Sequence, residues 1–341
     1  MHSIDPGHPD STMRPAGSKA EARAAQWCAA QLSSYGYEVE VDEFLSRTSV
    51  APWIAVDLSV AAIAGLLLGI VPLLSFALGA IALVLYARDV EGRAPLAARR
   101  ITSSNVVATT PRAPRIVVFA GLDGFQGWSA WHGSLGRKLR SATLVVHFIL
   151  IVIPAIAGAV WIFGAHSHVR VELLGALLAV VLIAASAWIC THDSLPEDLS
   201  KDIPVQTALR VGELHLPDVW IVLGGASGAG NEGIQALLHL RGEQIGSASI
   251  LALEQVGKGP VMAIEQEGVL KLRRAHGALV QAAEDAGAEV ADWRTTPTDG
   301  GVALARHFRA MTLLLGSGDE PDPESRMLAM VRSIIIASRS A

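Results

Sequence analysis

One serine of the chain lies where the nucleophile of a hydrolase could lie. Ser227 is part of the glycine-rich segment Gly225-Ala-Ser-Gly-Ala229, shortly after an apolar run that predicts a buried β-strand. The position resembles the nucleophile elbow of the pattern G-x-S-x-G, in which a strained turn exposes the serine oxygen. Gly225 fits that pattern, but Ala229 occupies the place of the second glycine. The chain therefore contains only half of a serine-hydrolase motif.

Two histidines have a spacing that could bind a metal ion. His166 and His168 lie two residues apart in a short polar segment. Imidazole is a good zinc ligand, but a protein zinc site takes three or four protein ligands. Two histidines in one short segment are more typical of a solvated turn, so the sequence predicts no metal site here.

The composition limits the class of protein. Of the 341 residues, 51% are hydrophobic and 17% are charged, and the mean hydropathy is +0.40. This excludes a disordered chain and a collagen-like repeat and argues against a purely soluble enzyme. A net charge of −5 argues against a nucleic-acid partner. Cys28 and Cys190 are too few for a disulfide framework, and the N-terminus lacks the pattern of a signal peptide.

The apolar excess is concentrated in two blocks, which predict two transmembrane hairpins. One helix over the first block would be about 45 Å long, whereas the hydrocarbon core of a bilayer is about 30 Å thick. The break at Gly69-Ile-Val-Pro72 therefore favours a hairpin over residues 53–88, with one tilted span as the alternative. A polar segment at 166–172 divides the second block into a hairpin over residues 143–190.

Two hairpins return the chain to the side it left, so the polar segments 1–52, 89–142 and 191–341 are expected to lie together. Basic residues flank the hairpins on that side, whereas Arg170 alone lies in the opposite loops. This asymmetry predicts a multi-pass protein of the cell (inner) membrane, with a cytoplasmic polar domain and the lipid bilayer as a partner. The flanking basic residues are Arg47, Arg88, Arg93, Arg99, Arg100, Arg137, Lys138 and Arg140.

The first hairpin contains a G-x-x-x-G motif formed by Gly65 and Gly69. Small residues at this spacing let two helices approach closely. The motif serves either a contact between chains or packing within the hairpins, and the sequence leaves both open.

The polar segments alternate between helical and strand patterns. This alternation predicts an α/β sandwich with a largely parallel sheet. Helices are expected at 18–35, 205–214, 233–241, 270–286, 300–307 and 323–338, and strands at 37–41, 105–109, 115–120, 219–223, 249–253, 261–264 and 311–315.

Short motifs in the same segments follow the order of a known family. They are Arg14-Pro-Ala-Gly-Ser18, Ser104-Asn-Val-Val-Ala108, Ile116-Val-Val-Phe-Ala-Gly-Leu-Asp123, Gly225-Ala-Ser-Gly-Ala-Gly-Asn-Glu-Gly233, Leu251-Ala-Leu-Glu-Gln-Val-Gly257 and Thr298-Asp299. Together they resemble the M28 family of zinc exopeptidases. The resemblance implies a three-layer, aminopeptidase-like α/β sandwich with a largely parallel central sheet, here interrupted by the two transmembrane hairpins.

The resemblance also implies what chemistry has been lost. Active members bind two zinc ions through histidine and carboxylate ligands, and a glutamate general base activates the bridging water. At the matching positions this chain has Gly121 for the first histidine, Ser227 for the general base and Gly228 for the adjacent ligand, while Glu254 replaces an aspartate. The motifs with the bridging aspartate and the final histidine are also absent. Asp123 is kept, but in the family it orients a ligand, so no metal or other cofactor is expected.

Three functions follow as hypotheses. The preferred one is a catalytically degenerate, membrane-integral M28-like protein that acts as a scaffold or binding subunit, with protein partners or further copies of itself. The alternative is an active M28-type metallopeptidase or another hydrolase with a remodelled cleft. That cleft would contain Asp123, Ser227, Glu254 and Asp299. The third is a small channel or transporter subunit, which the four predicted spans suggest.

Overall fold

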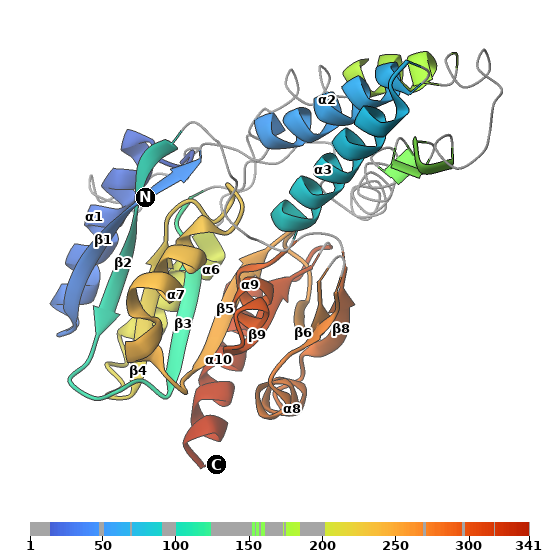
Figure 1. Cartoon of the computed structure of the whole chain (residues 1–341). Coiled ribbons are helices and arrows are strands. Elements are labelled where there is room, and N and C mark those ends of the chain that lie inside the picture. Colours follow the sequence, from blue (N-terminus) through green and yellow to red (C-terminus); the bar gives the residue numbers. More distant parts are fainter. Residues whose placement is uncertain are drawn as a thin grey trace.

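The structure, a computed structural model, has one α/β domain and a group of helices that projects from it (Figure 1). The described residues are 14–47, 51–68, 70–90, 100–123, 152–153, 155–156, 158–160, 173, 175–184, 202–268, 271–294, 297–316 and 318–340. Several residues to which the sequence analysis gave a role lie outside these ranges: Gly69, Arg93, Arg99, Arg137, Lys138, Arg140, His166, His168, Arg170 and Cys190.

The α/β domain is built on one mixed sheet with the order β1-β2-β4-β3-β5-β9-β6-β7, in which β8 also pairs with β6. The strands β4, β3, β5 and β9 run parallel in its centre, and antiparallel pairs flank them. Runs of β-branched and apolar residues make β3 and β4 wholly buried, as central parallel strands require. The bounds are β1 Glu38–Arg47, β2 Arg100–Thr109, β3 Ile116–Gly121, β4 Val219–Gly224, β5 Ser249–Gln255, β6 Val261–Glu267, β7 Arg273–Arg274, β8 Glu289–Trp293 and β9 Arg309–Leu315.

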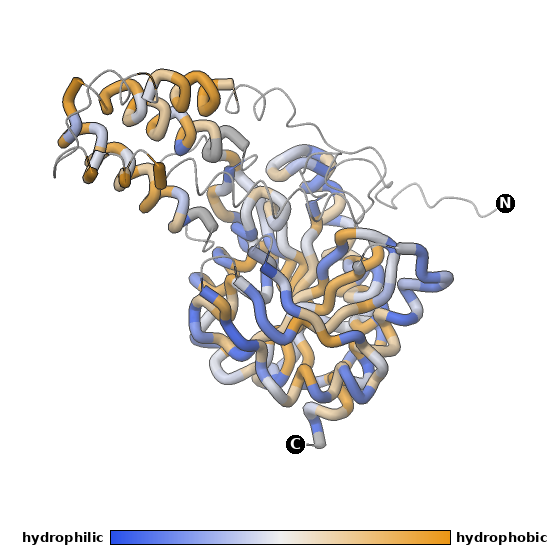
Figure 2. The backbone as a smooth tube through the Cα atoms, turned by 90° about the vertical axis from the view of Figure 1, so that its right-hand side faces the viewer, coloured by the Kyte–Doolittle hydropathy of each residue, from blue (hydrophilic) through white to orange (hydrophobic). Residues whose placement is uncertain are grey.

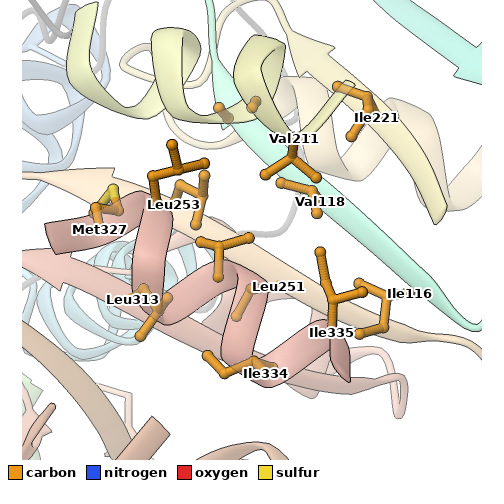
Figure 3. Close-up of a cluster of buried hydrophobic side chains, with 14 of the residues drawn as sticks. Ile116, Val118, Val211, Ile221, Leu251, Leu253, Leu313, Met327, Ile334 and Ile335 are labelled. Atoms are coloured by element: carbon orange, nitrogen blue, oxygen red, sulfur yellow. The ribbon is translucent and has the colours of Figure 1, made fainter. Parts of the chain in front are cut away.

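Helices cover both faces of this sheet and complete three layers. On one face, the apolar core joins the sheet to α1 Lys19–Ser34, α6 Asp202–Gly212, α8 Gly277–Asp285 and α10 Pro323–Ser340. Figure 3 shows part of this core, where side chains of α6 and α10 meet those of β3, β5 and β9. On the other face, α7 Glu232–Ile245 and α9 Asp299–Ala305 cover a second core. The predicted α/β layers are therefore present, with a sheet that is parallel only in part.

The two elements that sequence patterns missed lie late in the chain. The predicted helix over 270–286 begins only at Gly277, because β7 precedes it and pairs with β6. Strand β8 was not predicted at all. Its residues Glu289–Trp293 alternate poorly, with only Trp293 buried, and the strand forms by pairing with β6.

The projecting helices are α2 Ala51–Leu67 and α3 Pro72–Val90, which pack against helical residues 175–184. Figure 2 shows that most residues of this group are hydrophobic, whereas hydrophobic and hydrophilic residues are mixed along the α/β domain. Gly65 lies against Gly175 there, since a Cβ atom on Gly65 would be 3.0 Å from the Gly175 carbonyl oxygen. The close approach at Gly65 is thus a contact within the chain.

Within the described ranges, no helix is both long enough and apolar enough to cross a bilayer. Helix α2 has 17 residues, or about 25 Å at 1.5 Å per residue, and the apolar part of α3 ends before Arg88. This finding contradicts the transmembrane hairpins predicted over 53–88 and 143–190. The predicted multi-pass location in the cell (inner) membrane, with a cytoplasmic domain, depended on those hairpins and is wrong as well.

Candidate functional site

The sequence-predicted site residues come together at the carboxyl ends of the central strands. Gly121 ends β3 and lies beside Gly224, which ends β4, in the parallel register of these strands. Asp123 follows β3, Ser227 follows β4, and Glu254 belongs to β5. Parallel strands bring their carboxyl ends to one edge of a sheet, and loops at that edge form the binding sites of α/β proteins.

Asp123 holds the loop that carries Ser227. One carboxylate oxygen of Asp123 accepts a hydrogen bond from the backbone N–H of Ser227 at 2.7 Å. The other oxygen accepts from the N–H of Gly228 at 2.8 Å. Asp123 is fully buried, so these charge-assisted hydrogen bonds fix the position of the loop.

Asp299 links the serine to the third predicted acid. The Ser227 hydroxyl donates a hydrogen bond to one carboxylate oxygen of Asp299, and the Asn231 amide donates to the other at 3.1 Å. The backbone N–H of Asp299 donates to Glu254 at 3.1 Å. The four residues predicted for a remodelled cleft, Asp123, Ser227, Glu254 and Asp299, therefore belong to one hydrogen-bonded cluster.

The electrostatics of this cluster do not favour an activated serine. Burial raises the pKa of Asp299 well above its usual range, and the nearby Glu254 carboxylate raises it further. Asp299 therefore holds a proton at a higher pH than an ordinary aspartate does, and a protonated carboxyl cannot accept the serine proton. Among the described residues, no histidine or lysine hydrogen-bonds to the Ser227 hydroxyl, which is the partner that a nucleophilic serine requires.

Ser227 also fills the space beside Gly121. A Cβ atom on Gly121 would lie 2.8 Å from the Ser227 Cβ and 3.0 Å from its hydroxyl oxygen. Carbon atoms that are not bonded normally stay 3.5 Å or more apart, to judge from the roughly 3.5–4.0 Å optimum of the contact. A histidine at position 121 therefore has no room while the loop keeps this conformation.

The residues present do not fit the zinc pair that the M28 resemblance implies. Gly121 and Gly228 provide no ligand atoms, and both oxygens of Asp123 accept backbone hydrogen bonds. Among the described residues, no group of three or more histidine, cysteine, aspartate or glutamate side chains is arranged to hold a metal ion.

Glu21 and Asn105 also hold the Ser227 loop in place, and the sequence did not predict this role for either residue. Glu21 of α1 accepts hydrogen bonds from the N–H of Ala226 at 2.9 Å and from the Ser103 hydroxyl at 3.0 Å. The side-chain oxygen of Asn105 accepts from the N–H of Gly225 at 3.2 Å. Ser18 and Glu21 fit the capping-box pattern S-x-x-E, which could have located Glu21 at the start of a helix. That pattern contains no sign of the contact with residues 225–226.

A buried ion pair anchors the far end of the loop. Arg47, at the end of β1, pairs with Glu232 at 3.0 Å and donates to the carbonyl oxygen of Ala229 at 2.6 Å. Both side chains are buried, so each charge depends on the other.

A second buried acid supports the segment that carries Asp299. Glu267 of β6 accepts hydrogen bonds from the hydroxyls of Thr298 and Thr312. Thr298 caps α9 by accepting from the N–H of Gly301 at 2.9 Å. Burial raises the pKa of Glu267 from 4.5 to about 7, although the threonine hydrogen bonds oppose the shift. Nothing in the sequence around Glu267 indicates this role.

Comparison with known proteins gives structural likeness only. No family model and no curated protein matches the chain. Among solved structures, the aminopeptidase from Aneurinibacillus sp. strain AM-1 is 13% identical with a TM-score of 0.48, and the match covers 96% of this chain and 89% of that one. A Zn-dependent exopeptidase from Bacteroides vulgatus is 11% identical with a TM-score of 0.44, covering 96% and 90%. The glutaminyl cyclase of Tannerella forsythia is 11% identical with a TM-score of 0.42, covering 98% and 94%. At these values the likeness assigns neither a family nor an activity to this chain.

Proposed function

We propose that the α/β domain is a catalytically degenerate hydrolase domain that acts as a scaffold or binding subunit of a protein assembly. One observation carries this proposal. Ser227 occupies the space next to Gly121, and its loop is fixed there by Asp123, so the edge of the sheet is filled by the protein's own side chains. A site filled in this way has no room for the ligand set of a metallopeptidase.

The projecting helices supply a surface that suits a protein partner. Apolar side chains on the outer faces of α2 and α3 are exposed, and Leu73, Val84 and Ile63 retain half or more of their surface. Several exposed apolar side chains on two neighbouring helices are typical of a surface that another chain covers. We expect another protein chain, a second copy of this one included, to cover it.

The experiment has two parts and uses the full chain. First, the purified protein is dialysed against Zn²⁺ and assayed for bound metal and for release of N-terminal residues from peptides. We expect less than one zinc per chain and no release that a chelator inhibits. Stoichiometric zinc together with chelator-sensitive release would contradict the proposal. Second, native affinity purification should recover a partner, or further copies of the chain, at a fixed stoichiometry, and a strictly monomeric chain without such a partner argues against a scaffold.

The hydrogen bond between Ser227 and Asp299 favours one second candidate, a hydrolase that uses this serine. A fluorophosphonate probe tests it, because the probe labels only an activated serine. We expect wild type and Ser227→Ala to show the same background labelling. Labelling of wild type that Ser227→Ala abolishes would establish the serine as reactive and replace the first proposal.

A further inference from the structure

A cavity lies at the amino ends of the central strands, at the edge of the sheet opposite the candidate site. Its volume is about 410 Å³, within the range of roughly 300–1,000 Å³ that small-molecule sites occupy. Arg115 directly precedes β3, and Arg309 is the first residue of β9. Ser249 pairs with Ile116 on one side and with Arg309 on the other. The sheet register thus places the two arginines on either side of β5, and both line the cavity.

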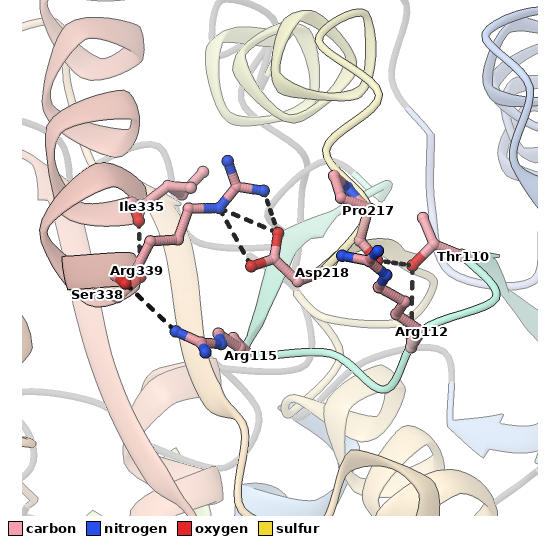
Figure 4. Close-up of polar contacts among 8 residues, drawn as sticks. All are labelled: Thr110, Arg112, Arg115, Pro217, Asp218, Ile335, Ser338 and Arg339. Carbon is pink, nitrogen blue, oxygen red and sulfur yellow. Dashed lines mark hydrogen bonds and ion pairs between the residues drawn. The ribbon is translucent and has the colours of Figure 1, made fainter. Parts of the chain in front are cut away.

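The charge of this cavity is positive. Its lining contains Arg115 and Arg309 but no aspartate or glutamate. Burial and the charge of Arg309 lower the pKa of the lining residue His276, so its imidazole adds no positive charge at neutral pH. The nearby carboxylate of Asp218 is held by Arg339, whose Nε lies 3.0 Å and 3.1 Å from the two Asp218 oxygens. Figure 4 shows this pair beside Arg115, whose guanidinium donates a weak hydrogen bond of 3.4 Å to the Arg339 carbonyl. Neither Arg115 nor Arg309 is within ion-pair distance of a carboxylate in the described part of the chain, but the charge of Arg115 helps to lower the pKa of Asp218.

Helix α8 adds donors at the same place. His276 is its N-cap residue, but its side chain makes no capping hydrogen bond. The first N–H groups of a helix have no partner inside the helix, and Ala278, in the first turn of α8, lines the cavity. The Nδ1 atom of His276 is buried and has no hydrogen-bond partner among the described residues. The cavity therefore brings together two cations and the N-terminus of a helix.

We propose that this cavity binds a phosphoryl group, as inorganic phosphate or as a small phosphate monoester. A phosphate dianion has three terminal oxygens, which can accept hydrogen bonds from the two guanidinium groups and from the N-terminus of α8 together. Arginine suits this role because its planar donors match phosphate geometry. The helix N-terminus adds backbone donors and a favourable dipole. The cavity is large enough for a small organic group attached to the phosphate.

Isothermal titration calorimetry of the full chain tests this proposal with three probes: phenyl phosphate, inorganic phosphate and benzoate. We expect saturable binding of phenyl phosphate with one site per chain. Similar binding of inorganic phosphate would identify the free anion as the ligand, whereas weaker binding would favour the ester. Benzoate has two oxygens and a single charge, so it should bind at least about tenfold more weakly than phenyl phosphate. Equal binding of benzoate, or no saturable binding of any phosphate, would overturn the proposal.

Variants locate the binding. Arg309→Gln and Arg115→Gln should each weaken phosphate binding by about tenfold or more, while Arg294→Gln, an exposed arginine that pairs with Asp292, should not. Ala278→Glu places a carboxylate in the cavity, yet an acidic residue in the first turn stabilises a helix, so the fold should be kept. Ala278→Gln is the matched neutral control. Binding that survives Ala278→Glu unchanged would show that the phosphoryl group binds elsewhere. Binding that falls equally in both Ala278 variants would show that the cavity does not select its ligand by charge, and this would also contradict the proposal.

Discussion

The substitution Gly121→Ala tests whether Ser227 fills the space where the M28 family has a metal ligand. The added Cβ would lie 2.8 Å from the Ser227 Cβ and 3.0 Å from its hydroxyl oxygen. Ser227 cannot easily move away, because Asp123 and Asp299 hold its N–H and its hydroxyl. Inserting a methyl group into such a packed region costs about 1–3 kcal/mol of unfolding free energy.

The second substitution Ser227→Gly removes both close contacts. The nearest remaining atom to the new Cβ would then be an Asp123 oxygen at 3.8 Å, an ordinary van der Waals distance. In that background, Gly121→Ala should cost no more than about 0.5 kcal/mol. The double-mutant cycle should therefore give a coupling energy of about 0.5–3 kcal/mol between positions 121 and 227.

Urea unfolding followed by far-UV circular dichroism measures the four proteins of this cycle. The control is Gly277→Ala, because a Cβ atom there meets nothing within 4 Å and Gly277 opens helix α8. It should be neutral or slightly stabilising. If Gly121→Ala is as harmless as Gly277→Ala, or costs the same with serine or glycine at 227, then the loop does not occupy this space and the proposed function loses its main support.

Three further predictions concern the buried charges. Glu267 has its pKa raised from 4.5 to about 7, so its contribution to stability is fully present below pH 4.5 and is lost as the pH rises to about 7. Glu267→Gln, which mimics the protonated acid, should be more stable than wild type at pH 8 by up to about 3 kcal/mol in urea unfolding, and a difference that does not change with pH would contradict this reasoning. Asp123→Asn should lower the free energy of unfolding by about 1–3 kcal/mol. It should also speed hydrogen exchange at the N–H groups of residues 227 and 228. Unchanged exchange at these two groups would show that Asp123 does not hold the loop. Arg47→Ala should cost about 3–5 kcal/mol, because the buried Glu232 carboxylate loses the Arg47 guanidinium and keeps the backbone N–H of residue 47. Adding Glu232→Ala should recover part of this cost, and full additivity of the two changes would refute the reasoning.

Much of the sheet could be predicted because its central strands carry a local signal. The run Ile116–Gly121 is apolar throughout, as a strand buried on both faces must be. Helix α1 could be predicted as well, because the spacing of its apolar residues and the N-cap at Ser18 are both features of the local sequence. Strand β8 was not, because its position depends on pairing with β6, which lies more than twenty residues earlier in the chain.

The candidate site was predictable only in part, for the same physical reason. The positions of Asp123 and Ser227 follow from predicted strand ends, and Asp299 was located by the order of the motifs. Their partners depend on contacts between distant segments, since 72 residues separate Ser227 from Asp299 and 205 separate Glu21 from Ala226. Over 53–88 the break near Pro72 was located from the sequence, since α2 ends at Leu67 and α3 begins at Pro72. The membrane crossing was wrong, because the length of the whole apolar run does not show whether each separate helix can span a bilayer.

The two edges of the sheet differ in how their charges are satisfied, and this difference decides where a ligand can bind. At the carboxyl edge, both carboxylate oxygens of the buried Asp123 already accept hydrogen bonds from backbone N–H groups, so this charge is stabilised by the protein itself. At the amino edge, Arg115 and Arg309 face a cavity whose lining has no carboxylate. A buried acid with internal donors gains little from a new partner, whereas exposed arginines that form no direct ion pair can donate charge-assisted hydrogen bonds to an anion that binds. A phosphate ligand should therefore leave the hydrogen exchange of residues 227 and 228 unchanged while it slows exchange in the first turn of α8.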